Sequence, residues 1–513
     1  MARKGVWFQA VLVGVVLIAG ALAVGYRLTA PTFWVDEAYA RFQGLGSVRG
    51  VLRSGDPHVA SSHLYHLINR ACESLVRDIA LGNRLPQAVA AWVSLLFVYL
   101  LGRLCFSPGA GVMAVLLLIT HPFFVRYAQE NRMQQMISAG MLASYYSSVR
   151  YLYTRQLGWL VGYVVGTAVL VRCGYGVLPM VILGVLWAAI YVQQRGGEHP
   201  VEGRTMLECF AGMVVVIALW LPYPLWFLTE AYERGIAASL TRGVSALDVF
   251  WEGPARLLPQ AIFEYCHRAF VDGLPWQIAL VLFIVALVGS LRYRRGTAWG
   301  IVAFGLLVTI VSFHMMNEAR GGTVPRRYVY LCPLTMVMLG GGMAMTVALF
   351  TEACQAGMRR VTRSPGVHER IRLFMPVVGW VAVSVCVALP LVCDHAYQLS
   401  QYYFTDRHVY RTMAHVLDMC AGPGARVISI DTDVRDWVLR EYAASQTWRL
   451  TGIYTTRSYA GKPATFCEEL LRREVAVTSE VWLTQVDLSA YGIPREQYVV
   501  VPCGESWLSL IHI

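Results

Sequence analysis

Residues Val6–Tyr26 read VWFQAVLVGVVLIAGALAVGY, an uncharged apolar run that follows Arg3 and Lys4. A transmembrane helix needs about 20 such residues, so this run is long enough to cross a bilayer. A secretory signal peptide would have a shorter apolar core and a small-residue cleavage site, which the sequence before Pro31 does not provide. The run therefore predicts a retained first membrane helix with the N-terminus in the cytoplasm.

The composition indicates a polytopic membrane protein. The chain has 513 residues, of which 56% are hydrophobic and only 15% are charged, and its mean hydropathy is +0.49. The net charge of +11 comes from arginines that sit mostly in short loops between apolar runs, which is typical of topology signals rather than of a nucleic-acid-binding face. The 12 cysteines contain no CxxC pair, so neither a disulfide framework nor a zinc site is indicated.

Further apolar runs bring the expected number of spans to eleven. A half-apolar piece, Leu64–Val76, is too short and too charged to span and is typical of an interfacial helix. The run Met133–Val149 carries Gln134, Gln135 and several serines, so it must be buried inside the bundle. The runs after the first are Pro86–Leu104, Ser107–Val125, Met133–Val149, Leu157–Arg172, Tyr175–Val192, Met206–Leu228, Leu274–Leu291, Ala298–Met316, Tyr328–Phe350 and Leu373–Cys393.

The loop charges agree with this topology. With the N-terminus inside, the strongest basic clusters, Arg292–Arg295 and Arg359–Arg372, fall on the same side as Arg3 and Lys4. An odd number of spans then places the C-terminus on the outer, periplasmic side of the cytoplasmic (inner) membrane. Loops from distant parts of the chain meet on that outer side, as a site at a membrane surface requires.

Two domains are expected, a transmembrane module over residues 1–393 and a soluble α/β domain over residues 394–513. The composition changes at Asp394 to that of an ordinary soluble domain. Ala425–Ile430 predicts a buried strand, Asp433–Ala443 a helix and Tyr498–Val501 a second strand. The glycines at 422 and 424 precede the first strand, whereas a dinucleotide fingerprint would follow it, so no nucleotide site is predicted.

The stretch Phe33–Tyr39, FWVDEAY, lies in the first outer loop, residues 27–85, and carries two adjacent carboxylates between aromatic residues. Adjacent side chains point about 100° apart on a helix and in opposite directions on a strand. Asp36 can therefore face a reaction cavity while Glu37 binds a cation or a nearby arginine. Two solvated charges at a helix exit would be the plain structural alternative.

Four stretches, in order, resemble the landmarks of the GT-C glycosyltransferases, in particular the protein O-mannosyltransferase and aminoarabinose transferase superfamily. The resemblance covers roughly residues 1–350 and implies an all-α membrane bundle of GT-C type with a small outer C-terminal domain. The stretches are Trp34–Ala38; Leu81–Pro86 (LGNRLP), which enters the next helix; Pro122–Met133 (PFFVRYAQENRM), a proline followed by an aromatic, an acid and an arginine; and Arg326–Pro333 (RRYVYLCP).

The first outer loop departs from the family pattern. Members commonly carry a His-Pro-Pro-aromatic stretch, and this chain has Pro57–His66, PHVASSHLYH, in its place. The histidines, among them His58 and His63, are expected to be titratable interfacial residues. As an alternative, the histidines and Glu37 could together ligate a divalent cation (Mg²⁺, Mn²⁺ or Zn²⁺). No other cofactor is expected.

The resemblance implies a hexosyl- or pentosyltransferase that takes a polyprenyl-phosphate-linked sugar at the outer membrane face and passes the sugar to a glycolipid or a secreted-protein hydroxyl. Such a transfer needs a base for the acceptor hydroxyl and positive charge for the leaving phosphate. Asp36 is the candidate base. Because the acceptor itself is the nucleophile, one displacement suffices and inversion is expected.

Arginines on the outer side are the candidates for the donor phosphate, because the planar guanidinium can hold two phosphate oxygens. They are Arg326, Arg327 and Arg132, and Glu130 would bind the acceptor, the sugar or a cation. His314 and Asn317, at the end of the preceding span, are supporting candidates. The structural alternatives are interfacial anchoring for the arginine pair and an interhelical ion pair for Glu130 and Arg132.

Other functions remain alternatives. A polytopic transporter or flippase would have a similar composition, but such transporters usually show internal repeats and charged or broken helices near the bilayer midplane. No repeat is evident, and the notable charges lie at outer helix ends. A GT-C-fold binding component without activity is a further alternative. An intramembrane metalloprotease is disfavoured because the chain has no His-Glu-x-x-His motif.

Overall fold

The structure is a computed structural model that describes residues 2–29, 37, 40–41, 44, 47–52, 62–173, 203–220, 276–292, 332–361, 365–404, 426–429, 449–453, 480–484, 498–503 and 506–512. The chain divides into two compact units. The first joins residues 1–26 with residues 46–400, and the second joins residues 27–45 with residues 401–513.

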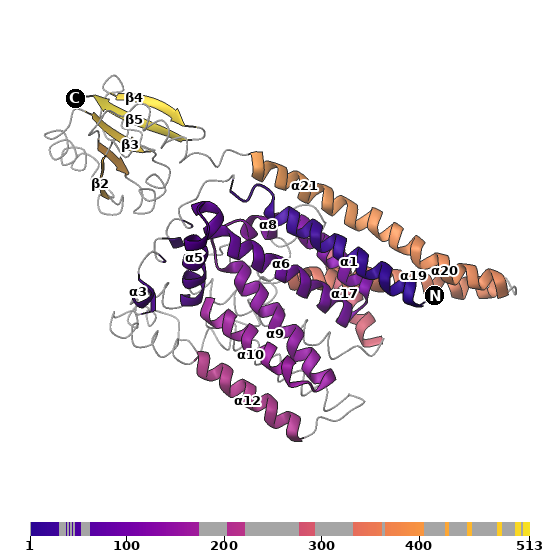
Figure 1. Ribbon diagram of the computed structural model, residues 1–513. Helices are drawn as coiled ribbons and strands as arrows, with labels where there is room; N and C mark the ends of the chain where they lie inside the picture. The colour runs from indigo at the N-terminus through magenta and orange to yellow at the C-terminus, as the bar shows by residue number, and fades with distance from the viewer. Residues whose placement is uncertain are drawn as a thin grey trace, which may run out of the picture. The chain divides into compact units, whose positions relative to one another are not determined.

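The first unit is a helical bundle (Figure 1). Among the described residues, three helices are long and apolar enough to cross a membrane, Ile79–Cys105, Cys332–Met358 and Phe374–Tyr397, and a bent pair makes a fourth if it is one span. The helices are α1 Ala2–Gly25, α3 Val48–Leu52, α5 His63–Leu75, α6 Ile79–Cys105, α7 Pro108–Thr120, α8 Pro122–Ala128, α9 Gln134–Thr154, α10 Leu157–Cys173, α12 Gly203–Trp220, α17 Trp276–Arg292, α19 Cys332–Val361, α20 Pro365–Val383, the π-helical turn η2 Ser384–Ala388 and α21 Leu389–Phe404.

The helical membrane fold predicted from hydropathy is confirmed. All but two of the expected spans overlap described helices, although Ser107–Val125 falls on two of them and Met206–Leu228 is described only as far as Trp220. The other two, Tyr175–Val192 and Ala298–Met316, lie outside the described residues. The last expected span, Leu373–Cys393, runs through α20, η2 and α21 as one continuous rod (Figure 1). The total of eleven spans and their orientation in the membrane stay predictions.

The expected single span Ser107–Val125 is wrong as a straight helix. The chain breaks at His121, and α7 and α8 enclose an angle of 69°. Pro122 disfavours helical backbone in the residue before it, and His121 accordingly has an extended conformation with ψ at 119°. The hydroxyl of Thr120 donates a hydrogen bond to the Leu117 carbonyl at 3.1 Å. This bond gives a donor to one of the carbonyls that the end of α7 leaves without a backbone partner.

The polar helix α9 is buried inside the bundle, as its sequence predicted. Gln135, Ser138 and Ser144 have no exposed surface. The hydroxyl of Ser144 donates to the Gly140 carbonyl at 2.8 Å and lies 3.1 Å from the hydroxyl of Thr167 on α10. Small and hydroxylated residues thus let α9 and α10 approach closely, which is a common packing mode in membranes.

A glycine pair brings α6 and α7 into backbone contact. A Cβ atom on Gly102 would lie 2.6 Å from the Cα atom of Gly111 on α7. Backbone atoms cannot rotate away as a long side chain can, so this approach requires glycine at both positions.

Gly102→Ala is therefore expected to destabilise the bundle by about 1–3 kcal/mol, because the methyl group forces α6 and α7 apart. Gly158→Ala is the matched control, since a Cβ there meets nothing within 4 Å and alanine favours the helix. Thermal unfolding of the purified variants in detergent measures both. Equal melting temperatures for the two variants would contradict the close approach of α6 and α7.

The second unit contains a five-stranded sheet with the order β2-β1-β3-β5-β4. Strand β1 pairs parallel with β2 and β3, whereas β5 pairs antiparallel with β3 and β4. Two strands, β1 and β4, coincide with the two that the sequence predicted, and the expected helix Asp433–Ala443 lies outside the described residues. The strands are β1 Arg426–Ser429, β2 Arg449–Ile453, β3 Glu480–Thr484, β4 Tyr498–Cys503 and β5 Ser506–His512.

Candidate functional site

A buried polar cluster lies where α5, the start of α6 and the turn between α8 and α9 meet. Its centre is Asn131, which has no exposed surface. The Asn131 Oδ1 atom accepts hydrogen bonds from the Tyr65 hydroxyl at 2.8 Å and from Asn69 Nδ2 at 2.7 Å. The Tyr65 hydroxyl also lies 2.8 Å from the Asn131 carbonyl oxygen. Helix α5 therefore fixes the turn through both the backbone and the side chain of Asn131.

The start of α6 joins the same cluster. Asp78 caps the helix, with its Oδ1 atom accepting from the Leu81 amide at 2.8 Å. One turn later Asn83 accepts from Asn131 Nδ2 at 3.2 Å through Oδ1 and donates to Glu73 on α5 at 3.1 Å through Nδ2. The second and third family landmarks, 81–86 and 122–133, are therefore in direct contact.

Charged residues flank Asn131 in the buried turn. The carboxylate of Glu130, which is 1% exposed, accepts from Arg126 Nε at 2.9 Å. Arg126 is a third exposed along its side chain, so the pair spans from the interior to the surface. Arg132 follows directly and is half-buried. The turn thus holds a carboxylate and a guanidinium close together in a largely buried setting.

Gln129 ties this turn to the first helix. Its Nε2 atom donates to the carbonyls of Val24 at 3.0 Å and Tyr26 at 2.8 Å, at the end of α1. These carbonyls belong to the last turn of α1 and the residue after it, where a helix leaves acceptors without partners. The cluster therefore gathers α1, α5, α6, α8 and α9 at one end of the bundle.

A glutamine on α6 offers further polar atoms inside the bundle. Gln87 lies one turn beyond Asn83 on the same helix face, and it has no exposed surface. Within the described part of the chain, neither atom of its amide has a hydrogen-bond partner. A buried amide without hydrogen bonds costs free energy of folding, so a polar group of a ligand or a water molecule that bonds to Gln87 would be favoured.

The structure places only some of the predicted site residues. Glu130 and Arg132 lie together in the turn, and His63 begins α5 in the same unit. Glu37 belongs to the second unit, where it is 1% exposed. The remaining candidates, Asp36, His58, His314, Asn317, Arg326 and Arg327, lie outside the described residues. Over the residues that are described, no group of three metal-ligating side chains occurs.

His63 and His66, both on α5, are the described histidines of the altered stretch Pro57–His66. Burial lowers the pKa of His63 below its usual value, the Arg172 guanidinium lowers it further, and a backbone hydrogen bond with Val51 acts in the opposite direction. Its Nε2 atom is buried and has no hydrogen-bond partner among the described residues. The fold therefore favours the neutral imidazole.

Acidification is expected to destabilise the protein through His63. Below about pH 6.5 the unfolded chain takes up a proton at this position, whereas the folded chain resists it, so stability falls as the pH decreases through that range. Melting temperatures of wild type and His63→Gln, taken near neutral pH and near pH 5.5, measure this. The variant should lose less stability on acidification, and Arg172→Gln should show an intermediate loss. An equal fall in all three proteins would refute the assignment.

Sequence reasoning missed the hydrogen-bonded part of the cluster. Asn83 and Asn131 stand inside the quoted landmarks but were not proposed as site residues, and neither were Tyr65 and Asn69. A signal was present, because Tyr65, Asn69 and Glu73 recur every four residues and so share one helix face. A polar stripe on a half-apolar helix predicts a buried polar partner.

The family comparison covers this cluster. Residues 64–226 match the family model described as dolichyl-phosphate-mannose-protein mannosyltransferase. This segment runs from α5 into the region after α12 and includes the turn around Asn131. It confirms the predicted family resemblance over this segment. No curated protein matches the chain significantly.

Solved structures confirm the fold. ArnT from Cupriavidus metallidurans in the apo state is 12% identical with a TM-score of 0.56, and the match covers 100% of this chain and 98% of that one. The same protein bound to undecaprenyl phosphate gives 0.52 at 12% identity, over 100% and 99% of the two chains. The oligosaccharyltransferase AglB from Archaeoglobus fulgidus, in complex with an inhibitory peptide and a dolichol-phosphate, gives 0.54 at 11% identity, over 98% and 74%. The chain therefore has a GT-C fold.

Proposed function

We propose that this protein is a transferase that moves a monosaccharide from a polyprenyl-phosphate donor to a hydroxyl acceptor. The proposal rests on the GT-C fold and on the segment that matches the dolichyl-phosphate-mannose-protein mannosyltransferase family. The acceptor is a glycolipid or a secreted protein at the outer face of the cytoplasmic membrane. The observation that carries the proposal is the buried cluster around Asn131, which lies inside the family segment. Binding of undecaprenyl phosphate by ArnT, which shares the fold, supports the class of donor.

The proposed reaction is a single displacement. Asp36 takes the proton of the acceptor hydroxyl, and the acceptor oxygen forms a bond to the anomeric carbon while the bond from that carbon to the donor phosphate oxygen breaks. The sugar inverts its configuration, and the polyprenyl phosphate leaves with the bonding electron pair. Arg326 and Arg327 stabilise the charge that grows on the phosphate.

The described residues have positioning roles in this proposal. The ion pair with Arg126 holds the Glu130 carboxylate in place, and carboxylate oxygens can accept hydrogen bonds from sugar hydroxyls or bind a cation. Arg132 adds positive charge beside it for the donor phosphate. The bonds of Asn131 to α5 and α6 hold both flanking residues in place, which limits the reorganisation that substrate binding would need. Glu37, His58, His63, His314 and Asn317 are proposed as supporting residues.

Purified protein in detergent, given a polyprenyl-phosphate-linked sugar and a panel of hydroxyl acceptors, tests the function. Release of polyprenyl phosphate in step with glycosylated acceptor is expected. Anomeric analysis of the product by nuclear magnetic resonance should show inversion, and retention would contradict the single displacement.

The same preparation separates transfer from transport. In detergent no second compartment exists, so a transporter or flippase would release no polyprenyl phosphate. Movement of the labelled donor between the leaflets of liposomes, without cleavage in either assay, would overturn the transferase assignment. Cleavage in detergent with the expected product would exclude an inactive binding component.

A further inference from the structure

A cavity of about 330 Å³ lies between the C-terminal ends of α6 and α9. It is lined by Leu100, Arg103 and Leu104 of α6 and by Tyr146 and Arg150 of α9. Ligand-binding cavities start at about 300 Å³, so this one is large enough for a small polar headgroup. Its lining combines two guanidinium groups, a phenol and two leucines, which suits a ligand with an anionic head and an apolar remainder.

This cavity is far from the cluster around Asn131. Asn83 and Arg103 lie on the same helix, α6, and are 20 residues apart. At about 1.5 Å per residue, the two positions are separated by about 30 Å. This is about the thickness of the hydrocarbon core of a bilayer. A ligand in the cavity therefore lies at the membrane surface opposite the candidate glycosyltransferase site.

The charge in the cavity is not balanced by the surrounding protein. Neither the Arg103 nor the Arg150 guanidinium has an ion-pair partner among the residues that the structure describes. Each helix C-terminus carries about half a negative charge, so the ends of α6 and α9 together offset only about one of the two positive charges. The remaining charge favours a bound anion.

Aromatic contacts hold one of the two arginines in place. The Arg150 guanidinium lies 5.3 Å from the centre of the Trp159 ring. The Tyr146 ring packs edge-on against Trp159 at 5.4 Å and contacts Phe97 at 5.8 Å. Cation–π contact of this kind restricts the guanidinium without using its hydrogen-bond donors. The donors therefore remain available to oxygen atoms of a ligand.

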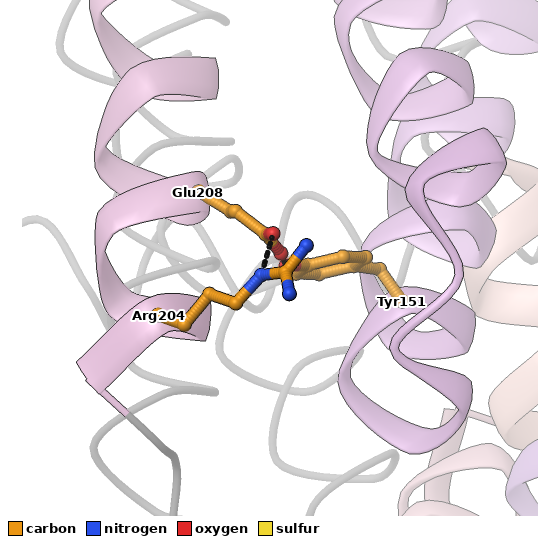
Figure 2. A network of polar contacts seen from close by, with 3 residues as sticks. All are labelled: Tyr151, Arg204 and Glu208. Carbon is orange, nitrogen blue, oxygen red and sulfur yellow. Dashed lines mark hydrogen bonds and ion pairs between the residues drawn. The ribbon is translucent and has the colours of Figure 1, made fainter.

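The carboxylate that α12 brings to this end of α9 is already occupied. Glu208 accepts a hydrogen bond from the Tyr151 hydroxyl and forms an ion pair with Arg204 Nε at 2.9 Å, as Figure 2 shows. Since both of its oxygens have partners, Glu208 is committed to joining α12 to α9 and does not neutralise the cavity.

We propose that this cavity binds the phosphate group of an anionic phospholipid, held between the forks of Arg103 and Arg150. Arginine forks match two phosphate oxygens each, and basic pockets between membrane helices are known to bind lipid headgroups. The site is separate from the donor site because the two lie at opposite membrane surfaces. It would anchor the ends of α6 and α9 to the lipid.

The test compares wild type with Arg103→Gln/Arg150→Gln in detergent micelles doped with phosphatidylglycerol, with phosphatidylcholine or with inorganic phosphate. Phosphatidylglycerol should raise the melting temperature of wild type well above the value with phosphatidylcholine, and the double variant should lose this rise. We expect the double variant to bind the anionic lipid at least about tenfold more weakly. Arg49→Gln, which removes one exposed positive charge elsewhere, should bind like wild type.

Native mass spectrometry of retained lipid adducts gives a second readout that does not depend on thermal unfolding. If inorganic phosphate alone reproduces the rise, and the double variant abolishes it, the ligand is a soluble phosphate in the same site. If the double variant retains the wild-type preference for phosphatidylglycerol, or if wild type shows none, the proposal is overturned. If the double variant folds poorly, the same measurements are made on Arg103→Gln alone. This single variant should fold like wild type, because Arg103 is exposed and makes no described hydrogen bond through its side chain.

Discussion

Asp36→Asn is expected to lower the rate of sugar transfer by about 10²–10⁴-fold, the range that a general base typically contributes. The amide keeps the size of the carboxylate but cannot accept the proton of the acceptor hydroxyl. Binding of the polyprenyl-phosphate donor should change little, because the proposed phosphate contacts come from arginines. The measurement is single-turnover release of polyprenyl phosphate, with donor affinity determined separately.

Glu352→Gln serves as the matched control for this variant. It also removes one carboxylate, at an exposed position on α19 outside the proposed machinery, and is expected to transfer sugar at the wild-type rate. Retention of full activity by Asp36→Asn would show that another group is the base. A loss of donor binding by the same factor as the rate would instead assign Asp36 to substrate binding.

Asn131→Ala is expected to cost at least about 3 kcal/mol of stability, because it removes hydrogen bonds from three buried side chains at once. The Tyr65 hydroxyl, the Asn69 amide and the Asn83 carbonyl each lose a bond, and these residues are 3%, 4% and 1% exposed. Thermal or denaturant unfolding in detergent measures the loss. Transfer activity should fall as well at temperatures where the variant is folded, since Glu130 and Arg132 flank the removed anchor.

Gln156→Ala provides the comparison for Asn131→Ala. It removes a side-chain amide at an exposed position, so its effect should lie within about 0.5 kcal/mol of zero. If the two variants unfold alike, the Asn131 hydrogen bonds contribute no net stability. If Asn131→Ala loses stability but keeps full activity when folded, the cluster is structural and the positioning role is wrong.

Hydropathy predicted the helices well because crossing a bilayer leaves the backbone few alternatives. Without water in the hydrocarbon core, each peptide group must bond within its own segment, so a long apolar run is a helix almost regardless of its neighbours. The exception was the run from Ser107 to Val125. There Pro122 interrupts an otherwise uniform apolar pattern, and hydropathy averages over a single residue that decides the backbone conformation.

The candidate site was predicted less completely, for a physical reason. Charged residues at helix ends draw attention, and Glu130 and Arg132 were proposed on that basis. Asn131 between them, and its partners on α5 and α6, are neutral and individually unremarkable. Their role depends on contacts over 48 to 66 residues of sequence separation, which single-sequence reasoning does not supply.

The hydrogen bonds from Gln129 to the carbonyls at the end of α1 have a consequence for biosynthesis. Gln129 is 105 residues after Val24, so a ribosome that adds about 5–20 residues per second reaches it about 5–20 s later. Until then the carbonyls that end the first helix can be satisfied only by water or lipid headgroups. Helix α1 is therefore completed only after the turn between α8 and α9 has been made, which gives the bundle a preferred order of assembly.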